Sequence, residues 1–104
     1  MIKLTVLYPN TPGAHFDMDY YLEIHLPFVK SKLGSYCKGC TVTRGISAAI
    51  TGTKPPYLAW CDISFESVEA FESSFLPHAP EFRADHENYT NVVPERQLSD
   101  ILHG

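Results

Sequence analysis

The sequence predicts an α+β fold of the ferredoxin-like type, in which four antiparallel strands and two helices follow the order βαββαβ in one domain over residues 1–104. Three observations predict this fold. Short stretches carry the alternation or the β-branched residues of strands, longer stretches carry apolar residues at helical spacing, and segments rich in Gly and Pro separate them. At this length roughly 65% of the unfolded surface is buried on folding, which supports one core.

The first strand and the first helix follow from the N-terminal third of the chain. Residues 2–8 alternate with the two-residue period of a strand that has one buried face. Asp17 is a suitable N-cap for a helix over residues 17–33, and Gly34 suits the left-handed residue that follows a helix. Inside this helix Pro27 has no N–H group, so we expect a bend or a broken hydrogen bond close to it.

Three further strands complete the predicted sheet. Residues 41–46 and 57–65 indicate two strands of a hairpin, separated by a loop that contains residues 51–56. The last strand is predicted over residues 89–99. Because Pro94 cannot donate a hydrogen bond to a central ladder, we expect this strand at an edge of the sheet.

The second helix is predicted before the last strand. Ser67 is its N-cap, and apolar residues recur at helical spacing until Pro77-His78-Ala79-Pro80 interrupts the pattern. We expect a kink or a restart there, followed by a continuation that carries Phe82. Asp85 and His86 are interpreted as part of a capping or turn arrangement.

Composition and charge exclude several classes of function. With 44% hydrophobic and 19% charged residues, the chain is not intrinsically disordered. Lys and Arg number 8 and Asp and Glu number 12, so the net charge is −4, and no basic cluster exists for a nucleic-acid backbone. No apolar run approaches the ~20 residues of a membrane span, and no secretion signal is present. We therefore expect a cytoplasmic protein without nucleic-acid or membrane partners.

The three cysteines, Cys37, Cys40 and Cys61, are expected to be reduced. An odd number without a secretion signal argues against a disulfide framework. Cys37 and Cys40 have CxxC spacing, but Gly34 precedes them and β-branched residues follow, which favours a turn into a strand over a thioredoxin-like site. A zinc site would need two further ligands. We expect no metal and no cofactor, and haem ligation by a histidine is the disfavoured alternative.

The third predicted strand has two unlike faces. The more uniformly apolar one, which should pack under the helices, consists of Tyr57, Ala59, Cys61, Ile63 and Phe65. Leu58 and Trp60 lie on the opposite face, with Thr5 and Leu7 of the first strand. Leu58 and Trp60 would be exposed in a monomer, so we expect a homodimer in which a second copy of the chain covers this face.

A titratable side chain lies in the apolar part of the first helix. Only Asp19, Glu23 and Lys30 form a tight polar arc, so the helix should be heavily buried. His25 lies within the apolar sweep, four residues after Tyr21. It is either a core histidine bonded to a tyrosine or a backbone carbonyl, or a general acid/base, because its ordinary pKa near 6.5 allows proton exchange at neutral pH. We expect burial to lower the pKa of His25 and a tyrosine hydroxyl to donate to its ring.

Two groups of residues resemble a known family. Around the first helix they are Tyr8-Pro9, Phe16-Asp17, Tyr20-Tyr21, His25-Leu26-Pro27, Val29 and Leu33-Gly34. Near the C-terminus they are Asp85, Asn88-Tyr89-Thr90-Asn91, Pro94 and Gln97-Leu98-Ser99. Together they resemble the EthD family, named from ethyl tert-butyl ether degradation. The resemblance implies a dimeric α+β barrel, in which two ferredoxin-like protomers join their sheets and each keeps a pocket between its own sheet and helices.

The resemblance implies less about the reaction. The EthD protein is an accessory component of an ether-degrading monooxygenase system, and its relatives are described as reductases, polyketide-modifying enzymes or lactone isomerases. His25 matches the position that the family motif marks as functional, and Tyr21 accompanies it in the motif. The stretch from Phe65 to His78 is also similar to plant-type polyketide cyclases of the same superfamily. This makes His78 a second candidate, with a solvated loop histidine as the alternative.

We therefore hypothesise a cofactor-independent enzyme of catabolic or secondary metabolism that acts on a small apolar or aromatic carbonyl compound. His25 and Tyr21 would be catalytic, in an isomerisation, cyclisation, decarboxylation or oxygenation. The candidates for substrate binding are Tyr8, Phe28, Tyr57, Ala59, Cys61 and His78, with Ala59 and Cys61 leaving room for the ligand. The alternative is a non-catalytic accessory or ligand-binding protein of a monooxygenase degradation system.

Overall fold

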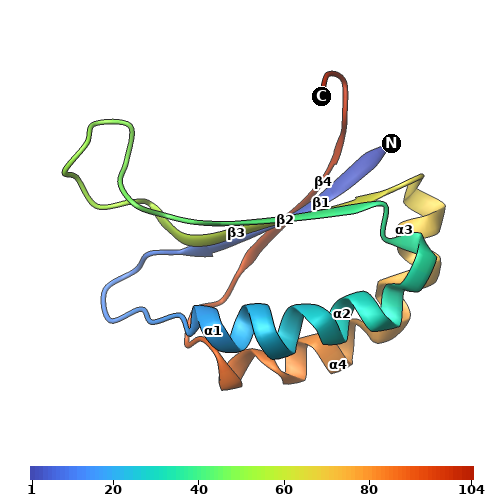
Figure 1. The fold of residues 1–104 in the computed structure, drawn as a ribbon, viewed down its shortest axis with the longest axis horizontal. Coiled ribbons are helices and arrows are strands. Elements are labelled where there is room, and N and C mark those ends of the chain that lie inside the picture. Colours follow the sequence, from blue (N-terminus) through green and yellow to red (C-terminus); the bar gives the residue numbers. More distant parts are fainter.

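One antiparallel sheet carries all of the helices on a single face in the computed structural model, which describes residues 1–104 (Figure 1). The strands are β1 (Ile2–Pro9), β2 (Gly39–Arg44), β3 (Tyr57–Phe65) and β4 (Glu95–Asp100), and their order across the sheet is β2-β3-β1-β4. The helices are α1 (Met18–Tyr20), α2 (Leu26–Leu33), α3 (Val68–Ser74) and α4 (Ala79–Ala84). This is the predicted ferredoxin-like α+β architecture.

The first helical run continues across Pro27 because its hydrogen bonding changes just before the proline. Residues Tyr21–His25 form a π-helical turn between α1 and α2, and the turn ends where the Leu26 N–H donates to the Tyr21 carbonyl. Pro27 therefore lies in the first turn of α2, where a missing N–H is tolerated. The expected disturbance of the hydrogen bonds beside His25 is confirmed, in the form of a π-helical turn.

The ends of the helical runs follow the predicted capping residues. The Asp17 carboxylate accepts the Tyr20 N–H at 3.0 Å, and the Ser67 hydroxyl accepts the Ala70 N–H at 3.1 Å. Each cap satisfies an N–H group that has no partner inside its helix. Gly34 follows α2 with a φ of 56°, a conformation that favours glycine.

The buried side of the first helical run is a single stripe of side chains. It consists of Tyr21, His25, Val29 and Leu33. A uniform spacing of four residues exceeds the 3.6 residues of an α-helical turn, and the wider π-helical turn helps to keep the stripe in line. Leu22 and Ile24 are 45% and 52% exposed. The helix is thus less buried than its apolar composition predicts.

Two element boundaries differ from the sequence prediction. β2 ends at Arg44, and Ile46, which was predicted to belong to it, lies in the following loop with 90% of its surface exposed. β4 begins at Glu95, immediately after Pro94, and the preceding residues form a turn whose Thr90 makes an isolated bridge to Phe16. The edge position predicted for the last strand is confirmed, as is the break before α4, where residues Leu76–His78 form a 3₁₀ turn.

A β-bulge changes the predicted faces of β3 at one end. Tyr8 of β1 lies opposite Ala59, but Pro9 lies opposite Tyr57, so Leu58 is an extra residue. From Ala59 to Phe65 the predicted alternation holds, and its odd-numbered residues are buried. Before the bulge it is reversed, and Leu58 packs against the core.

Tyr57 consequently lies on the outer face of the sheet, away from the helices. Its ring is 5.7 Å from the ring of Trp60, and its hydroxyl lies 3.4 Å from the Glu95 carboxylate. Trp60 and Glu95 both lie opposite Leu7 in the sheet. The neighbours of Leu7 in β1, Val6 and Tyr8, face the core, so Leu7 and its two partners face outward. The predicted inner position of Tyr57 and outer position of Leu58 are therefore wrong.

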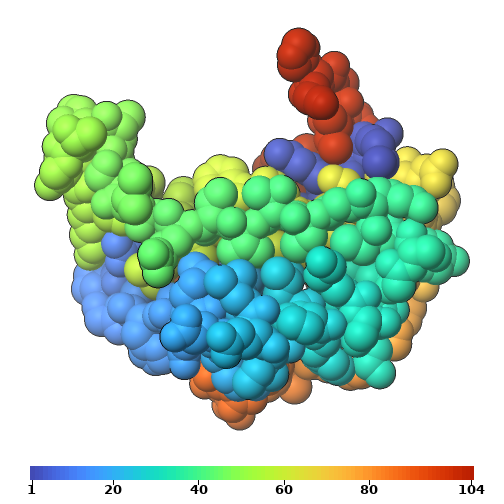
Figure 2. Space-filling model, viewed as in Figure 1, coloured from blue at the N-terminus to red at the C-terminus, as the bar shows by residue number.

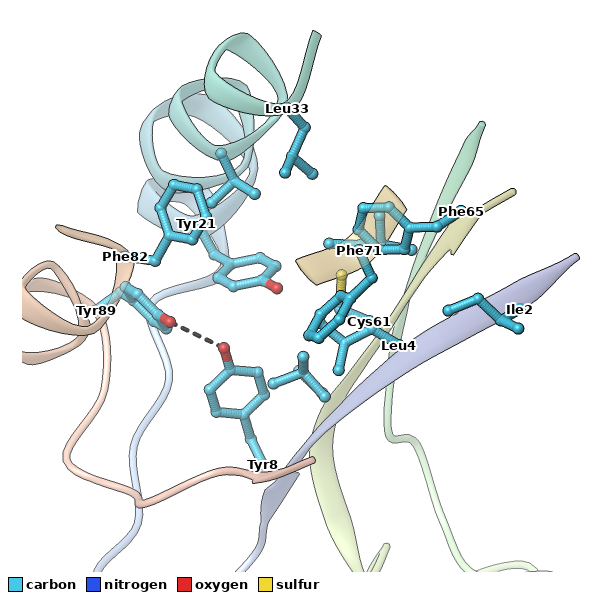
Figure 3. Close-up of a cluster of buried hydrophobic side chains, with 14 residues drawn as sticks. Ile2, Leu4, Tyr8, Tyr21, Leu33, Cys61, Phe65, Phe71, Phe82 and Tyr89 are labelled. Carbon is cyan, nitrogen blue, oxygen red and sulfur yellow. Dashed lines mark hydrogen bonds between the residues drawn. The ribbon is translucent and has the colours of Figure 1, made fainter. Parts of the chain in front are cut away.

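The core fills the space between the sheet and the helices (Figure 3). The β1 residues on its inner face, Ile2, Leu4, Val6 and Tyr8, are buried as predicted. The loop between β2 and β3 and the C-terminal tail rise from the opposite side of the sheet, so they frame its outer face (Figures 1 and 2). None of the helices has the length and apolar character that crossing a membrane requires.

Candidate functional site

His25, which is buried, and Asp85, which is half-buried, form a hydrogen-bonded pair between the two helical runs. His25, in the π-helical turn, is 4% exposed, and its Nδ1 lies 2.8 Å from Oδ2 of Asp85. Asp85 ends α4, so it lies in the turn that the sequence predicts, but its carboxylate points at the imidazole. The ring partner of His25 is thus a carboxylate, and the predicted tyrosine donor is wrong.

Further hydrogen bonds hold the Asp85 carboxylate in its ionised form. Its Oδ1 accepts the Tyr20 hydroxyl at 2.7 Å and the Asn88 side-chain amide at 2.8 Å. Burial raises the pKa of Asp85, but the hydrogen bonds from Asn88, Tyr20 and His25 outweigh it and lower the pKa below its ordinary value. Because an ionised carboxylate only accepts hydrogen bonds, the proton of neutral His25 lies on Nδ1.

The other ring nitrogen of His25 is left as a proton acceptor. Nε2 makes no hydrogen bond within the chain, and no fully buried side-chain polar atom lacks a partner. Nε2 therefore has access to the cavity that His25 lines. Burial lowers the pKa of His25 and Asp85 opposes that shift only in part, so the ring is neutral at pH 7, as predicted.

Three tyrosines surround the imidazole. The Tyr8 and Tyr89 hydroxyls lie 2.9 Å apart, and the Tyr21 hydroxyl points toward the sheet beside Cys61 (Figure 3). The rings of Tyr21 and Tyr89 lie 5.3 Å and 4.6 Å from that of His25. Burial raises the pKa of all three tyrosines, so their hydroxyls keep their protons. They are therefore hydrogen-bond donors at the site.

The cavity beside His25 is small and adjoins two larger spaces. It measures about 30 Å³, which holds a water molecule or two and is far below the ~300 Å³ of an ordinary ligand site. His86 and Arg96 separate it from an open cleft of about 590 Å³ beside the turn that leads into β4. Phe75 and Phe82, with Arg96, separate it from an apolar groove of about 260 Å³ along β4.

Four of the predicted site residues come together at this cavity. His25, Tyr21, Tyr8 and Cys61 all line it. The π-helical turn supplies the first two, and the inner faces of β1 and β3 supply the others. The small Cys61 side chain lies beside the Tyr21 hydroxyl but leaves less room than expected, because the tyrosine fills the space (Figure 3).

Four other predicted residues lie elsewhere. Tyr57 is on the outer face of the sheet, and Ala59 is buried without lining the cavity. Phe28 packs against Phe82, with ring centres 5.7 Å apart and away from the cavity wall. His78 pairs with Glu81 of its own helical run at 3.1 Å, which agrees with the loop-histidine alternative. His78 lies in the 3₁₀ turn Leu76–His78 and does not line the cavity.

The sequence prediction missed Asp85, His86, Tyr89 and Arg96 as site residues. Asp85 and Tyr89 belong to the C-terminal run that resembles the EthD family, which was the available signal for them. Nothing in the spacing relates residue 85 to residue 25, because 60 positions separate them. Burial, with the positive charge of Arg96, lowers the pKa of His86 to about 4, so the second histidine of the site is also neutral.

The cysteines behave as predicted, and their thiols are free. Cys37 precedes β2 and Cys40 lies within it, which confirms the turn into a strand. The interaction with the Cys61 thiol lowers the pKa of Cys40 to about 7. No group of three or more His, Cys, Asp or Glu side chains is placed to hold a metal ion.

Comparison with known proteins gives matches among solved structures. No family model and no curated protein matches the chain. An EthD-like protein from Ralstonia eutropha JMP134 is 38% identical, over 98% of this chain and 92% of its own, with a TM-score of 0.92. An ethyl tert-butyl ether degradation (EthD) family protein from Bacillus halodurans C-125 is 15% identical, over 98% and 99% of the two chains, with a TM-score of 0.74. A protein from Arabidopsis thaliana is 16% identical, over 100% and 98%, with a TM-score of 0.68.

Proposed function

The chain belongs to the EthD-like family, and within that family we propose that it is a cofactor-independent enzyme that moves a proton on a small carbonyl compound, with His25 as the base. The observation that carries the proposal is the 2.8 Å hydrogen bond from Nδ1 of His25 to Asp85, which leaves Nε2 open to a cavity. An ionised carboxylate on one ring nitrogen fixes the tautomer and stabilises the imidazolium that forms when the other nitrogen takes a proton.

The surrounding groups suit the removal of a proton from a carbon next to a carbonyl. Nε2 of His25 takes the proton, the electron pair of the broken C–H bond moves onto the carbonyl oxygen, and Asp85 balances the charge of the ring. The protonated Tyr21 and Tyr89 hydroxyls donate hydrogen bonds to the developing enolate. Return of the proton to another carbon completes an isomerisation, and no oxidant or reductant is consumed.

Proton exchange into solvent tests this proposal without knowledge of the natural reaction. Nuclear magnetic resonance in D₂O would follow the loss of protons next to the carbonyl in a panel of aromatic ketones and lactones. We expect the wild type to accelerate exchange for at least one compound. His25→Gln should lower that rate by at least about 100-fold, because a positioned base contributes about 10²- to 10⁴-fold. Asp85→Asn should lower it too, because the amide favours the wrong tautomer.

His78→Gln is the matched control, since His78 is outside the cavity and should leave the exchange rate unchanged. Urea unfolding of each variant checks that the fold is retained. Equal exchange by the wild type and His25→Gln would refute the role of the histidine. A wild type that exchanges no faster than buffer would refute the enzyme proposal and favour the accessory, ligand-binding alternative.

We also propose that two copies associate through the outer faces of their sheets. Trp60 is 39% exposed on this face, and the ring of Tyr57 packs beside it. The segments that rise around the face carry large exposed apolar side chains, among them Ile46, Ile50 and Leu102, which are 90%, 76% and 93% exposed. Covering such a surface is the physical reason for the dimer.

A further inference from the structure

Arg96 occupies the point where three spaces around the site meet. Among the lining residues it alone is shared by the cavity at His25, the open cleft of about 590 Å³ and the apolar groove of about 260 Å³. Arg96 lies on the edge strand β4 opposite Val6, so it belongs to the face of the sheet that carries the helices. A cation therefore stands at the mouth of the cavity that His25 lines.

The charge of Arg96 has no acidic partner. Arg83 of α4 lines the same cleft and the same groove, and neither arginine makes an ion pair with any carboxylate. The chain has 12 acidic residues and a net charge of −4, so carboxylates are not scarce. Glu87, the acidic residue in the cleft wall, also forms no ion pair. Two unpaired guanidinium groups that face one concave surface attract an anion.

Two neutral polar side chains of the cleft, those of Thr90 and Asn91, are occupied by bonds within the chain. The Thr90 hydroxyl donates to the His15 carbonyl, and the Asn91 side chain bridges Gly13 and the backbone of His15. These bonds fix the loop that forms the cleft wall. The arginines consequently remain as the charged free donors, next to the neutral His86 imidazole. A planar guanidinium matches the two oxygens of a carboxylate.

We propose that Arg96 and Arg83 bind the carboxylate of the substrate at the mouth of the His25 cavity, so that the substrates are small aromatic or apolar carboxylates. This inference rests on the proposed function. The apolar part of such a substrate fits the groove that Phe75, Phe82 and Leu98 line, and its acidic C–H then approaches His25. Glu87 on the cleft wall disfavours a dianion such as a phosphate ester, which would meet more repulsion than a carboxylate.

Calorimetric titration with phenylacetate and with its neutral analogue phenylacetamide separates recognition of the charge from recognition of the ring. We expect the wild type to bind phenylacetate at least 10-fold more tightly than phenylacetamide, and more weakly as the salt concentration rises. Arg96→Gln should weaken phenylacetate binding by at least 10-fold and leave phenylacetamide binding unchanged. Arg83→Gln should have a smaller effect in the same direction.

Arg44→Gln is the matched control, because Arg44 ends β2 and lines neither the cleft nor the groove. Equal affinity for the two compounds, absence of binding, or an unchanged Arg96→Gln variant would overturn the inference. Tighter binding of inorganic phosphate than of phenylacetate would overturn it in favour of a phosphate ligand.

His25→Gln separates this inference from the proposed function. That variant should still bind phenylacetate, because the arginines are intact. If the wild type exchanges protons of neutral ketones but shows no preference for carboxylates, the role of His25 as the base is supported and the carboxylate site is refuted. If the wild type exchanges no protons but binds carboxylates selectively, and Arg96→Gln abolishes that binding, the carboxylate site is supported and the enzyme proposal is refuted.

Discussion

At the scale of single residues, the protonation states of two histidines follow from their surroundings. Burial lowers the pKa of both His25 and His86, and Arg96 adds to the effect at His86. The Asp85 carboxylate opposes the shift at both rings but does not cancel it. At neutral pH the site therefore holds two neutral imidazoles, one ionised carboxylate and one guanidinium.

This arrangement predicts a loss of stability in mild acid. The pKa of His86 is about 4 in the folded chain and near 6.5 in the unfolded chain, so between these values the unfolded chain binds the extra proton. The free energy of unfolding should thus fall as the pH is lowered from about 6.5 to about 4, and the lowered pKa of His25 acts in the same direction. Asp85, whose pKa is lowered from 3.8, contributes a further loss only below that range.

Urea unfolding at a series of pH values measures this dependence. His86→Asn should show a shallower decline between pH 6.5 and 4 than the wild type. His103→Asn, in the exposed C-terminal tail, is the control and should decline like the wild type. A wild-type stability that is constant from pH 7 to pH 5 would contradict the neutral state assigned to His86.

At the scale of elements, the π-helical turn Tyr21–His25 positions the imidazole that we propose as the base. It aligns Tyr21 and His25 with Val29 and Leu33 on one buried stripe, although their spacing exceeds a regular α-helical turn. It also moves Pro27 into the first turn of α2. The helix therefore tolerates a proline two residues after His25.

The tolerance of Pro27 predicts an asymmetry between two substitutions. Pro27→Ala should change the free energy of unfolding by less than about 1 kcal/mol, because the proline displaces no hydrogen bond that the first turn requires. Lys30→Pro, at an exposed position inside α2, should cost about 3 kcal/mol or more. Urea unfolding measures both. A loss of about 3 kcal/mol on Pro27→Ala would show that the proline itself holds the π-helical turn.

At the scale of the whole molecule, the strand order places the proposed carboxylate site and the proposed dimer interface on different parts of the sheet. β4 is an edge strand, so the groove beside it and Arg96 lie at the border of the sheet. The helices cover one face of the sheet, and the outer face carries Trp60 (Figure 1). A dimer through the outer face would leave the site of each copy between its own sheet and helices.

Substitution at the outer face tests the dimer. We expect the wild type to sediment as a dimer at micromolar concentration, and Trp60→Glu to shift it toward the monomer, because the substitution buries an unpaired charge at the interface. Leu22→Glu is the control, since Leu22 is 45% exposed on the first helical run and lies away from the outer face. A monomeric wild type, or a Trp60→Glu variant of unchanged size, would refute the interface.

The sequence by itself determined the features that depend on neighbours a few residues apart. Asp17 and Ser67 cap helices through N–H groups three residues ahead. Pro94, which has no N–H to donate, lies immediately before the edge strand β4. The two-residue period of β1 fixed its buried face. His25 and Tyr21 were selected as candidates in the same way, from one apolar stretch and a motif within it.

Only the tertiary structure decided which distant groups meet. Asp85 becomes the partner of His25 because α4 and the first helical run pack together under the sheet, across 60 positions of sequence. The bulge at Leu58 moves Tyr57 to the outer face, since one inserted residue reverses a two-residue period. Local propensity specifies the direction of a side chain relative to its own element, whereas the packing of elements specifies what that side chain faces.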